Sequence, residues 1–142
     1  MAEILHKIRI RAPRPEVYRA LSTIEGLASW WTQTTSGESA PGKTLEFRFG
    51  ENVNLMRVET LEPNQRVEWR CTGSHPDWVG TRLTFELFDE GEGTTLLFGH
   101  DSWKEPSPFL AHCSMKWATF LLSLRAYLET GAGRPFPLDI AV

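Results

Sequence analysis

The sequence predicts an α+β fold in which a curved antiparallel sheet of about six or seven strands wraps around one long C-terminal helix. Two observations predict it. Residues 107–131 carry helical signals from end to end, and most of the chain before them alternates between apolar and polar residues with period two. Two short helices are expected after the first strand. Residues 1–142 are expected to form a single domain.

The long C-terminal helix is marked at both ends. Ser107 is a suitable N-cap, Pro108 is favoured at the first helical position, and Gly131 suits the left-handed residue just past the end. The helix would be about 35 Å long, enough to cross a small domain. Its apolar residues recur at steps of three and four, the spacing of one buried face: Leu110, Cys113, Trp117, Phe120, Leu121, Leu124, Tyr127 and Leu128.

The N-terminal third predicts one strand and the two short helices. Residues 4–10 alternate between apolar and polar side chains, as in a half-buried strand. Pro13 and Pro15 end this strand and begin a short helix, and Thr23 can cap a second one. Residues 32–43, rich in Thr, Ser and Gly, are expected to be a loop.

Four or five further strands are expected before the long helix. Turn residues separate alternating segments at 45–49, 54–61, 67–71, 83–87 and 94–101. The last segment is apolar on both faces at Leu96, Leu97 and Phe98, which favours a central strand or one covered on its outer face. The inward residues of successive strands share one parity, as a single bent sheet facing one helix requires. Residues 133–142 are expected to form an extended tail.

Composition argues against several classes of protein. The chain has 15 Lys and Arg against 18 Asp and Glu, a net charge of −3, which disfavours a general nucleic-acid binder. The N-terminal segment does not resemble a signal peptide, and no segment reaches the ~20 apolar residues that span a bilayer. We therefore expect a cytoplasmic protein with no nucleic-acid or membrane partner. Cys71 and Cys113 fit no metal-ligand spacing and are expected to be buried thiols, so neither a metal nor a cofactor is predicted.

Aromatic side chains are expected to converge between the sheet and the long helix. They can fill the core, or they can leave a gap, because rigid rings pack less adaptably than Leu or Met. Such a gap would hold a small apolar or aromatic ligand. The candidates with inward-facing positions are Trp31, Phe47, Phe49, Trp69, Phe85, Phe98, Trp117 and Phe120.

Two further tryptophans fall in segments expected to flank the mouth of this gap. Trp78 lies in the predicted loop 73–80, and Trp103 lies between the last strand and the long helix. As large apolar residues in loops, they are candidates for a rim or lid of the binding site. Alternatively they form a homodimer interface, where Trp is enriched.

His100 is the polar candidate inside the sheet. It shares the inward parity of Leu96 and Phe98, and an imidazole can donate or accept a proton near neutral pH. It serves either as a ligand or acid–base group, or as a structural hydrogen-bonding residue. In a regular strand Asp101 would point to the opposite face, which makes it a poor orienting partner for this imidazole. Paired carboxylates, a nucleophile elbow and a phosphate loop are absent from the sequence, so no catalytic set is evident.

Three motifs resemble a known group of proteins. The first motif combines IRAP at 10–13, VYRAL at 17–21 and EGLASWW at 25–31. The second runs from Gly93 and Thr94 to His100. The third comprises Trp117, Leu121, Leu124 and YLETG at 127–131. With the element order, they make the chain similar to the START-like superfamily, also called SRPBCC, and within it to the activator of heat-shock-protein ATPase homologue family. The resemblance implies the helix-grip fold, as in the birch-pollen allergen. Relatives commonly have Gly just before the helix Trp, whereas this sequence has Met115–Lys116, which narrows that end of the cavity.

The resemblance implies a fold more directly than a function, because members of the superfamily bind hydrophobic small molecules, catalyse cyclisation or dehydration, or assist a chaperone. Our leading hypothesis is a binder of a small hydrophobic or aromatic molecule, held between the sheet and the long helix. The first alternative is an enzyme of the cyclase, dehydratase or hydrolase kind that uses His100. The second is a protein-interaction module of the chaperone-ATPase-activator kind.

Overall fold

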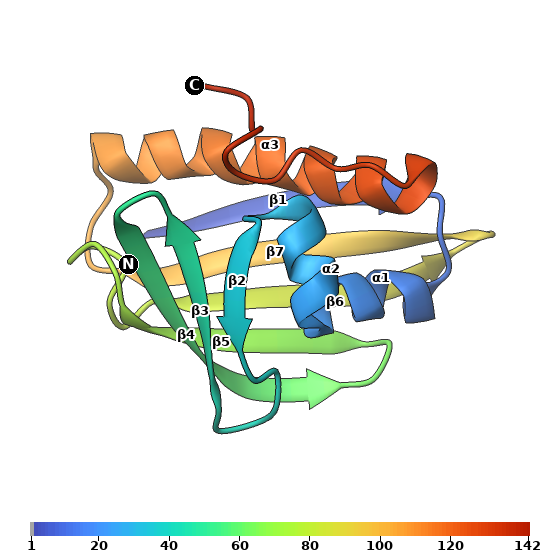
Figure 1. The fold of residues 1–142 in the computed structure, drawn as a ribbon, viewed down its shortest axis with the longest axis horizontal. Coiled ribbons are helices and arrows are strands. Elements are labelled where there is room, and N and C mark those ends of the chain that lie inside the picture. Colours follow the sequence, from blue (N-terminus) through green and yellow to red (C-terminus); the bar gives the residue numbers. More distant parts are fainter. Residues whose placement is uncertain (1) are drawn as a thin grey trace.

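The computed structural model describes residues 2–142, and its elements follow the predicted order (Figure 1). They are β1 (Ala2–Ile10), α1 (Arg14–Ser22), α2 (Ile24–Trp30), β2 (Thr34–Gly37), β3 (Thr44–Phe49), β4 (Asn52–Glu62), β5 (Arg66–Gly73), β6 (Arg82–Glu90), β7 (Gly93–Trp103) and α3 (Pro108–Thr130).

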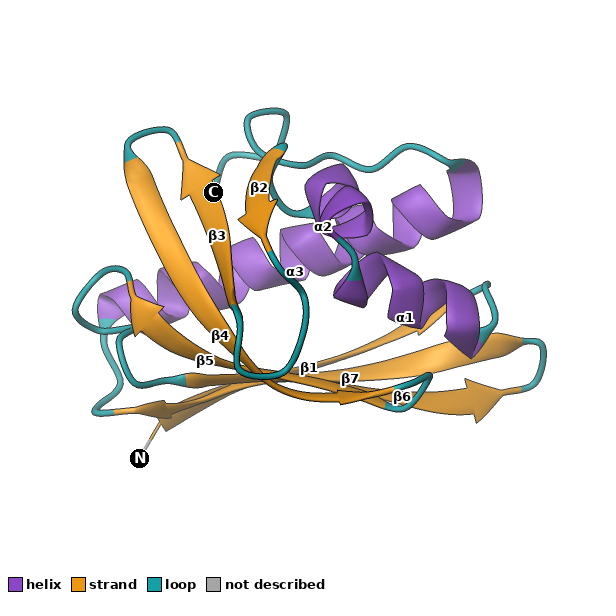
Figure 2. Cartoon of the chain, turned by 60° about the horizontal axis from the view of Figure 1, so that its bottom comes forward, coloured by secondary structure: helices purple, strands orange, loops and turns teal. Residues whose placement is uncertain are grey.

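The strands form one seven-stranded antiparallel sheet in the order β1-β7-β6-β5-β4-β3-β2. Figure 2 shows that the sheet bends strongly, so that β3 and β4 rise beside α3, which lies across the concave face. This arrangement is the predicted α+β helix-grip. β7 pairs with β1 on one side and β6 on the other, which confirms its interpretation as an interior strand.

The helix ends follow the predicted capping residues. The hydroxyl oxygen of Ser107 accepts a hydrogen bond from the backbone N–H of Leu110 at 3.1 Å. Gly131 adopts a left-handed φ of 88°, and its N–H donates to the carbonyl of Tyr127 at 2.9 Å. At the start of α2, the Thr23 hydroxyl accepts from the N–H of Gly26 at 3.0 Å. These local signals fix where α2 begins and where α3 begins and ends.

Two predictions about secondary structure are wrong. The segment expected to be a loop contains β2, which pairs through its backbone with β3, for example Thr35 opposite Phe47. Its sequence, TTSG, has no apolar alternation because an edge strand of this length is held by backbone hydrogen bonds rather than by a buried face. Trp103 is also not in a loop, because β7 continues to this residue.

The extended tail after α3 is tied to the middle of the chain. The N–H of Phe136 donates to the carbonyl of Trp31 at 2.8 Å, and the carbonyl of Phe136 accepts from Gln33 at 3.1 Å. The Phe136 ring also packs edge-on against Phe49, with centroids 5.4 Å apart. The tail therefore holds the end of α2 next to the β3–β4 hairpin.

None of the helices within residues 2–142 has the length and hydropathy of a membrane span.

Candidate functional site

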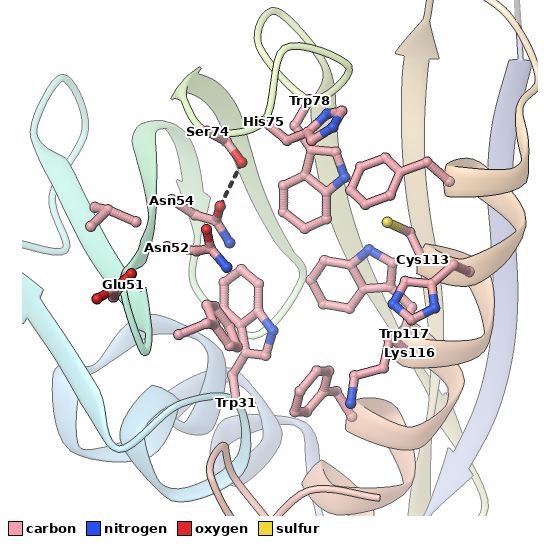
Figure 3. A pocket seen from close by; sticks show the side chains of 15 residues that line it. Trp31, Glu51, Asn52, Asn54, Ser74, His75, Trp78, Cys113, Lys116 and Trp117 are labelled. Carbon is pink, nitrogen blue, oxygen red and sulfur yellow. Dashed lines mark hydrogen bonds between the residues drawn. The ribbon is translucent and has the colours of Figure 1, made fainter. Parts of the chain in front are cut away.

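A cavity of about 550 Å³ lies between the N-terminal half of α3, the β3–β4 hairpin and the loop after β5. Figure 3 shows its two walls facing one another across Trp31, with α3 on one side and the hairpin on the other. The side chains that line it are Trp31, Phe49, Glu51, Asn52, Val53, Asn54, Ser74, His75, Trp78, Phe109, His112, Cys113, Lys116, Trp117 and Phe120.

Three tryptophans form the inner aromatic wall of the cavity. The ring of Trp117, on α3, lies with its centroid 5.0 Å from that of Trp31 and 6.1 Å from that of Trp78, to which it is nearly parallel. Behind Trp31, the rings of Phe47 and Trp69 lie at 4.3 and 5.9 Å and hold it in place. Rigid side chains packed in this way give the cavity a fixed apolar wall.

The opposite wall is polar and comes from the ends of two neighbouring strands. Asn52 and Asn54 share the inward face of β4 with the buried residues Met56 and Val58. Ser74 follows directly after β5, and its hydroxyl donates to Oδ1 of Asn54 at 2.5 Å (Figure 3). The hydrophobic face of β4 therefore gives way to amides where the strand reaches the cavity.

Cys113 and Lys116 lie on the α3 side of the cavity, one helical turn apart. Burial raises the pKa of the Cys113 thiol to about 11, although the indole N–H of Trp78 opposes this shift, so the thiol is protonated at neutral pH. The Lys116 ammonium pairs with the carboxylate of Asp139 and donates to the carbonyl of Ile140 at 3.0 Å. It also lies 5.0 Å from the centre of the Phe120 ring. The tail thus neutralises the cation on this wall.

Two exposed histidines flank the outer end of the cavity. The ring of His75 stacks on that of Phe109 with centroids 4.2 Å apart, and His112 lies on the same helix, 6.4 Å from Phe109. The stack joins the loop after β5 to the first turn of α3. Within residues 2–142, no group of three or more His, Cys, Asp or Glu side chains lies where it could hold a metal ion.

His100 lies behind the aromatic wall and does not line the cavity. Its side chain is fully buried, and both ring nitrogens are occupied. An indole nitrogen only donates, so Nδ1 accepts from Trp117 at 3.1 Å, and the ring proton sits on Nε2, which donates to the Thr81 hydroxyl at 2.8 Å. The Thr81 hydroxyl in turn donates a hydrogen bond to the carbonyl oxygen of Trp78 at 2.6 Å. Every polar atom of the imidazole is therefore used within the core.

The environment of His100 keeps it neutral. Desolvation by burial lowers its pKa to about 3, against a small opposing effect of the nearby Asp101 carboxylate. As expected from the strand parity, Asp101 points outward, where Arg82 binds it at 2.8 Å. Through its two hydrogen bonds, His100 connects β7 to Thr81, just before β6, and to Trp117 on α3.

The sequence-predicted site residues divide into two sets. Lining the cavity are Trp31, Phe49, Trp78, Trp117 and Phe120. In the core behind it lie Phe47, Trp69, Phe85, Phe98, His100 and Trp103.

Two expectations about the tryptophans need correction. Trp103 is only 1% exposed and donates its indole N–H to the carbonyl of His100 at 3.0 Å, so it is neither a rim nor an interface residue. Trp78 lines the cavity but is 8% exposed, so it is not available on the surface for a dimer interface. Both rings pack against His100, with centroids 4.8 Å away, which explains why these loop-adjacent aromatics are buried.

Sequence reasoning missed most of the polar lining. Asn52 and Asn54 carry a detectable signal, because they continue the inward parity of Met56 and Val58. Lys116 was recognised only as a departure from the Gly common at that position. His75, Ser74 and Glu51 lie in turns, where no periodicity indicates direction. The remaining missed residues are Val53, Phe109, His112 and Cys113.

Fold and cavity together define the class, a helix-grip protein of the START-like superfamily with a cavity beside its C-terminal helix. Within it, the family described as "Activator of Hsp90 ATPase homolog 1-like protein" matches residues 11–129, and the chain belongs to that family. No protein with a curated description matches the chain significantly.

Solved structures support this assignment. The solution structure of the Aha1 dimer from Colwellia psychrerythraea is 42% identical, with a TM-score of 0.88 over 94% of this chain and 100% of that one. A crystal structure from Staphylococcus saprophyticus is 22% identical, with a TM-score of 0.78 over 93% and 95% of the two chains. DynU16, from the dynemicin biosynthetic locus, is 24% identical, with a TM-score of 0.75 over 92% of this chain and 48% of its own. The latter two are similar in fold alone.

Proposed function

We propose that this protein binds a small, largely apolar or aromatic molecule in the cavity between the sheet and α3. The observation that carries this proposal is the composition of the lining. An aromatic wall of Trp31, Trp78 and Trp117 faces a few polar groups on β4 and after β5. Ligand sites commonly combine mostly apolar walls with a few placed polar groups in cavities of about 300–1,000 Å³, and this cavity, at about 550 Å³, lies in that range.

The alternative of an enzyme that uses His100 receives no support from the geometry. A general acid or base must reach the substrate, whereas this imidazole lies outside the cavity lining. Its lowered pKa also leaves it unable to supply a proton near neutral pH. Binding without catalysis at His100 is therefore the simpler function for this site.

Titration of the protein with a panel of aromatic molecules, followed by tryptophan fluorescence, tests the proposal. We expect a saturable response, because three of the chain's tryptophans line the cavity. Phe109→Ala should weaken binding at least about threefold, because it removes part of an aromatic contact surface. The matched control is Phe88→Ala on the outside of the sheet, where the ring is 49% exposed, and it should bind like wild type. A panel in which no member gives a saturable response would overturn the proposal.

A second candidate function follows from the family description, which names activation of an Hsp90 ATPase. Met115 and Leu122 are exposed apolar residues seven positions apart on α3, so they share one outward helix face that a partner protein could cover. If this function holds, the protein should stimulate the ATPase of the Hsp90-type chaperone from the same organism. Met115→Glu with Leu122→Glu should reduce that stimulation, whereas Phe88→Glu should not. Absence of stimulation by the wild type would rule the function out.

We also propose a homodimer as the assembled state. The support is that the relative from Colwellia psychrerythraea, 42% identical to this chain, is described as a dimer. Light scattering coupled to size-exclusion chromatography should then give twice the mass of one chain. A monomer at about 100 µM would contradict it, since a dimer with a Kd of roughly 1 µM (about 8 kcal/mol) is largely assembled at that concentration.

A further inference from the structure

The polar wall of the cavity has a defined direction of hydrogen bonding. Asn54 lies on the inward face of β4, opposite Phe47 in the ladder with β3. Its Oδ1 accepts the proton of the Ser74 hydroxyl at 2.5 Å. Because that oxygen is turned toward Ser74, the Nδ2 group of the same amide is turned away from it, into the space in front of Trp31 and Trp117 (Figure 3). Asn54 therefore presents two N–H donors to the cavity.

These donors have no protein partner. Among residues 2–142, no side chain or carbonyl accepts a hydrogen bond from Nδ2 of Asn54, although the residue is half-buried. A half-buried amide with unpaired donors favours a ligand that brings an acceptor, since leaving such donors unpaired on ligand binding would cost affinity. The cavity thus selects for an oxygen or nitrogen acceptor at this position.

The facing wall sets the shape of the rest of the molecule. Trp31, Trp117 and Trp78 follow one another with centroid separations of 5.0 and 6.1 Å, and the last two rings are inclined by only 12°. Such a surface favours a planar aromatic body stacked along it. The acceptor must then lie on the edge of that body that reaches Asn54.

The charges around the cavity favour an uncharged acceptor. Glu51 is exposed, and its carboxylate points away from Asn52 and Asn54 (Figure 3), so it leaves the acceptor position itself uncharged. On the other wall, the Lys116 ammonium is already paired with Asp139. An anionic group beside Asn54 would therefore lose hydration without gaining an ion pair with Lys116, whereas a neutral carbonyl oxygen has a smaller desolvation cost.

We propose that the ligands of this cavity are neutral, planar aromatic molecules carrying a carbonyl oxygen, which accepts a hydrogen bond from Nδ2 of Asn54. Ser74 is a positioning residue, because its hydroxyl fixes which end of the amide faces the ligand. This inference rests on the proposed ligand-binding function, and it adds the chemical class of ligand.

A matched set of probes tests it. The compound 2-acetylnaphthalene carries the carbonyl, and 2-isopropenylnaphthalene replaces its oxygen with a CH₂ group of nearly the same shape. The wild-type protein should bind the ketone about 3- to 10-fold more tightly than the alkene, the advantage of one net hydrogen bond. The carboxylate 2-naphthoate, measured at pH 7.5, should bind more weakly than the ketone.

Substitutions at Asn54 assign the preference to this amide. Asn54→Leu should reduce the ketone-to-alkene ratio of affinities to about one, with alkene affinity nearly unchanged. Asn54→Asp keeps the shape but offers only acceptors, so it should reverse the ratio. The control Thr72→Ala, on β5 outside the cavity lining, should keep the wild-type ratio.

Substitutions at Ser74 test its positioning role. Ser74→Ala frees the amide to rotate, so the ketone preference should fall by about two- to threefold while alkene affinity is retained. Ser74→Thr keeps the hydroxyl and should restore the preference. If Ser74 had only a structural role, Ser74→Ala would instead weaken the binding of the ketone and of the alkene to the same extent.

Three results would overturn the inference. They are a ketone-to-alkene ratio near one in the wild type, a ratio that Asn54→Leu and Asn54→Asp leave unchanged, and tighter binding of 2-naphthoate than of the ketone. In each case the proposed ligand-binding function would stand if any probe gives saturable binding. Failure of every probe and every member of the aromatic panel would overturn both.

Discussion

The indole N–H of Trp117 donates to Nδ1 of His100 across 3.1 Å, and both side chains are buried, with Trp117 2% and His100 0% exposed. This bond connects the middle of α3 to the interior strand β7. It also fixes the tautomer of His100, because only an unprotonated Nδ1 can accept it. One hydrogen bond therefore positions a cavity-lining ring and a buried imidazole at once.

Trp117→Phe tests the energetic weight of this bond. Phe retains an aromatic ring, but Nδ1 of His100 loses its donor, and a buried acceptor left unpaired costs about 1–3 kcal/mol. We expect the free energy of unfolding, measured in urea at pH 7.5, to fall by about 2 kcal/mol or more, including the smaller buried area.

A double-mutant cycle separates the bond from the lost packing. The partner substitution His100→Leu removes the acceptor, and combining it with Trp117→Phe should show a coupling energy of about 1 kcal/mol. A coupling energy indistinguishable from zero would mean that the bond adds nothing to stability and that the two residues matter only through packing.

The lowered pKa of His100 predicts a specific dependence of stability on pH. In the unfolded chain the imidazole takes up a proton at a pKa of about 6.5, whereas in the folded protein it does so only at about 3. The unfolded state therefore binds more protons between these values. The contribution of His100 to stability is complete above about pH 6.5 and is lost as the pH falls from there toward 3.

Urea unfolding at pH 7.5, 6.0 and 5.0 measures this effect. The free energy of unfolding of the wild type should fall by up to about 1.4 kcal/mol per pH unit below pH 6 relative to His100→Gln, which cannot titrate. The carboxylates titrate in both proteins and cancel in the comparison. Parallel pH profiles of the two proteins would show that the imidazole is not held neutral in the folded state.

The predicted and observed positions of His100 show what strand parity can and cannot predict. Alternation along β7 places His100 on the inward face, and the structure agrees. Parity cannot tell whether an inward residue meets a cavity or a packed core, because that depends on side chains from β6, α3 and the loop after β5. Trp103 differs, because the predicted strand ends at residue 101 whereas β7 continues to Trp103.

The capping residues and the strand alternation, by contrast, depend on local chemistry, so the fold class and the ends of α3 could be predicted from the sequence. The edge strand β2 could not, because backbone pairing with β3 holds it and the TTSG segment carries no hydrophobic pattern. Asn52 and Asn54 lie between these cases. Their direction follows from the parity of Met56, but their place at a cavity follows only from where the strand ends.

The ion pair between Lys116 and Asp139 predicts how firmly the tail is held. Both side chains are largely buried, at 23% and 12% exposure, so the pair is screened less than a surface ion pair. Asp139→Ala should lower the free energy of unfolding by about 1 kcal/mol. It should also speed amide hydrogen exchange at Gln33 and Phe136, whose backbone bonds fasten the tail.

The control for this prediction is Asp89→Ala, which removes the partner of Arg14. That carboxylate is 70% exposed, and exposed pairs contribute about 0–1 kcal/mol, so little change is expected. If the two variants are equally stable and the exchange rates at Gln33 and Phe136 do not change, the tail is held by its backbone bonds alone.

Gly26→Ala has two opposing effects on stability, because it raises the helix propensity of α2 but places a Cβ where α2 packs closely against α1. Gly26 lies inside α2, where Ala is ordinarily more favourable than Gly by about 1 kcal/mol. A Cβ at this position, however, would lie 2.6 Å from Cα of Ala20 and 2.9 Å from its carbonyl oxygen, which also accepts the indole N–H of Trp30. These are backbone atoms, so relief requires α1 and α2 to separate.

The free-energy cost of separating α1 from α2 should exceed the gain from the higher helix propensity of Ala. Overpacking of this kind costs about 1–3 kcal/mol, and the Thr23 hydroxyl that caps α2 would also be displaced, since it lies 2.9 Å from the new Cβ. We expect Gly26→Ala to lower the free energy of unfolding by about 1–3 kcal/mol in urea denaturation. Ser29→Ala, three residues further along the same helix, should stay within about 0.5 kcal/mol of wild type. A Gly26→Ala protein as stable as wild type would mean that α1 and α2 can move apart freely, and that their contact does not determine how Trp30 and Trp31 are positioned beside the cavity.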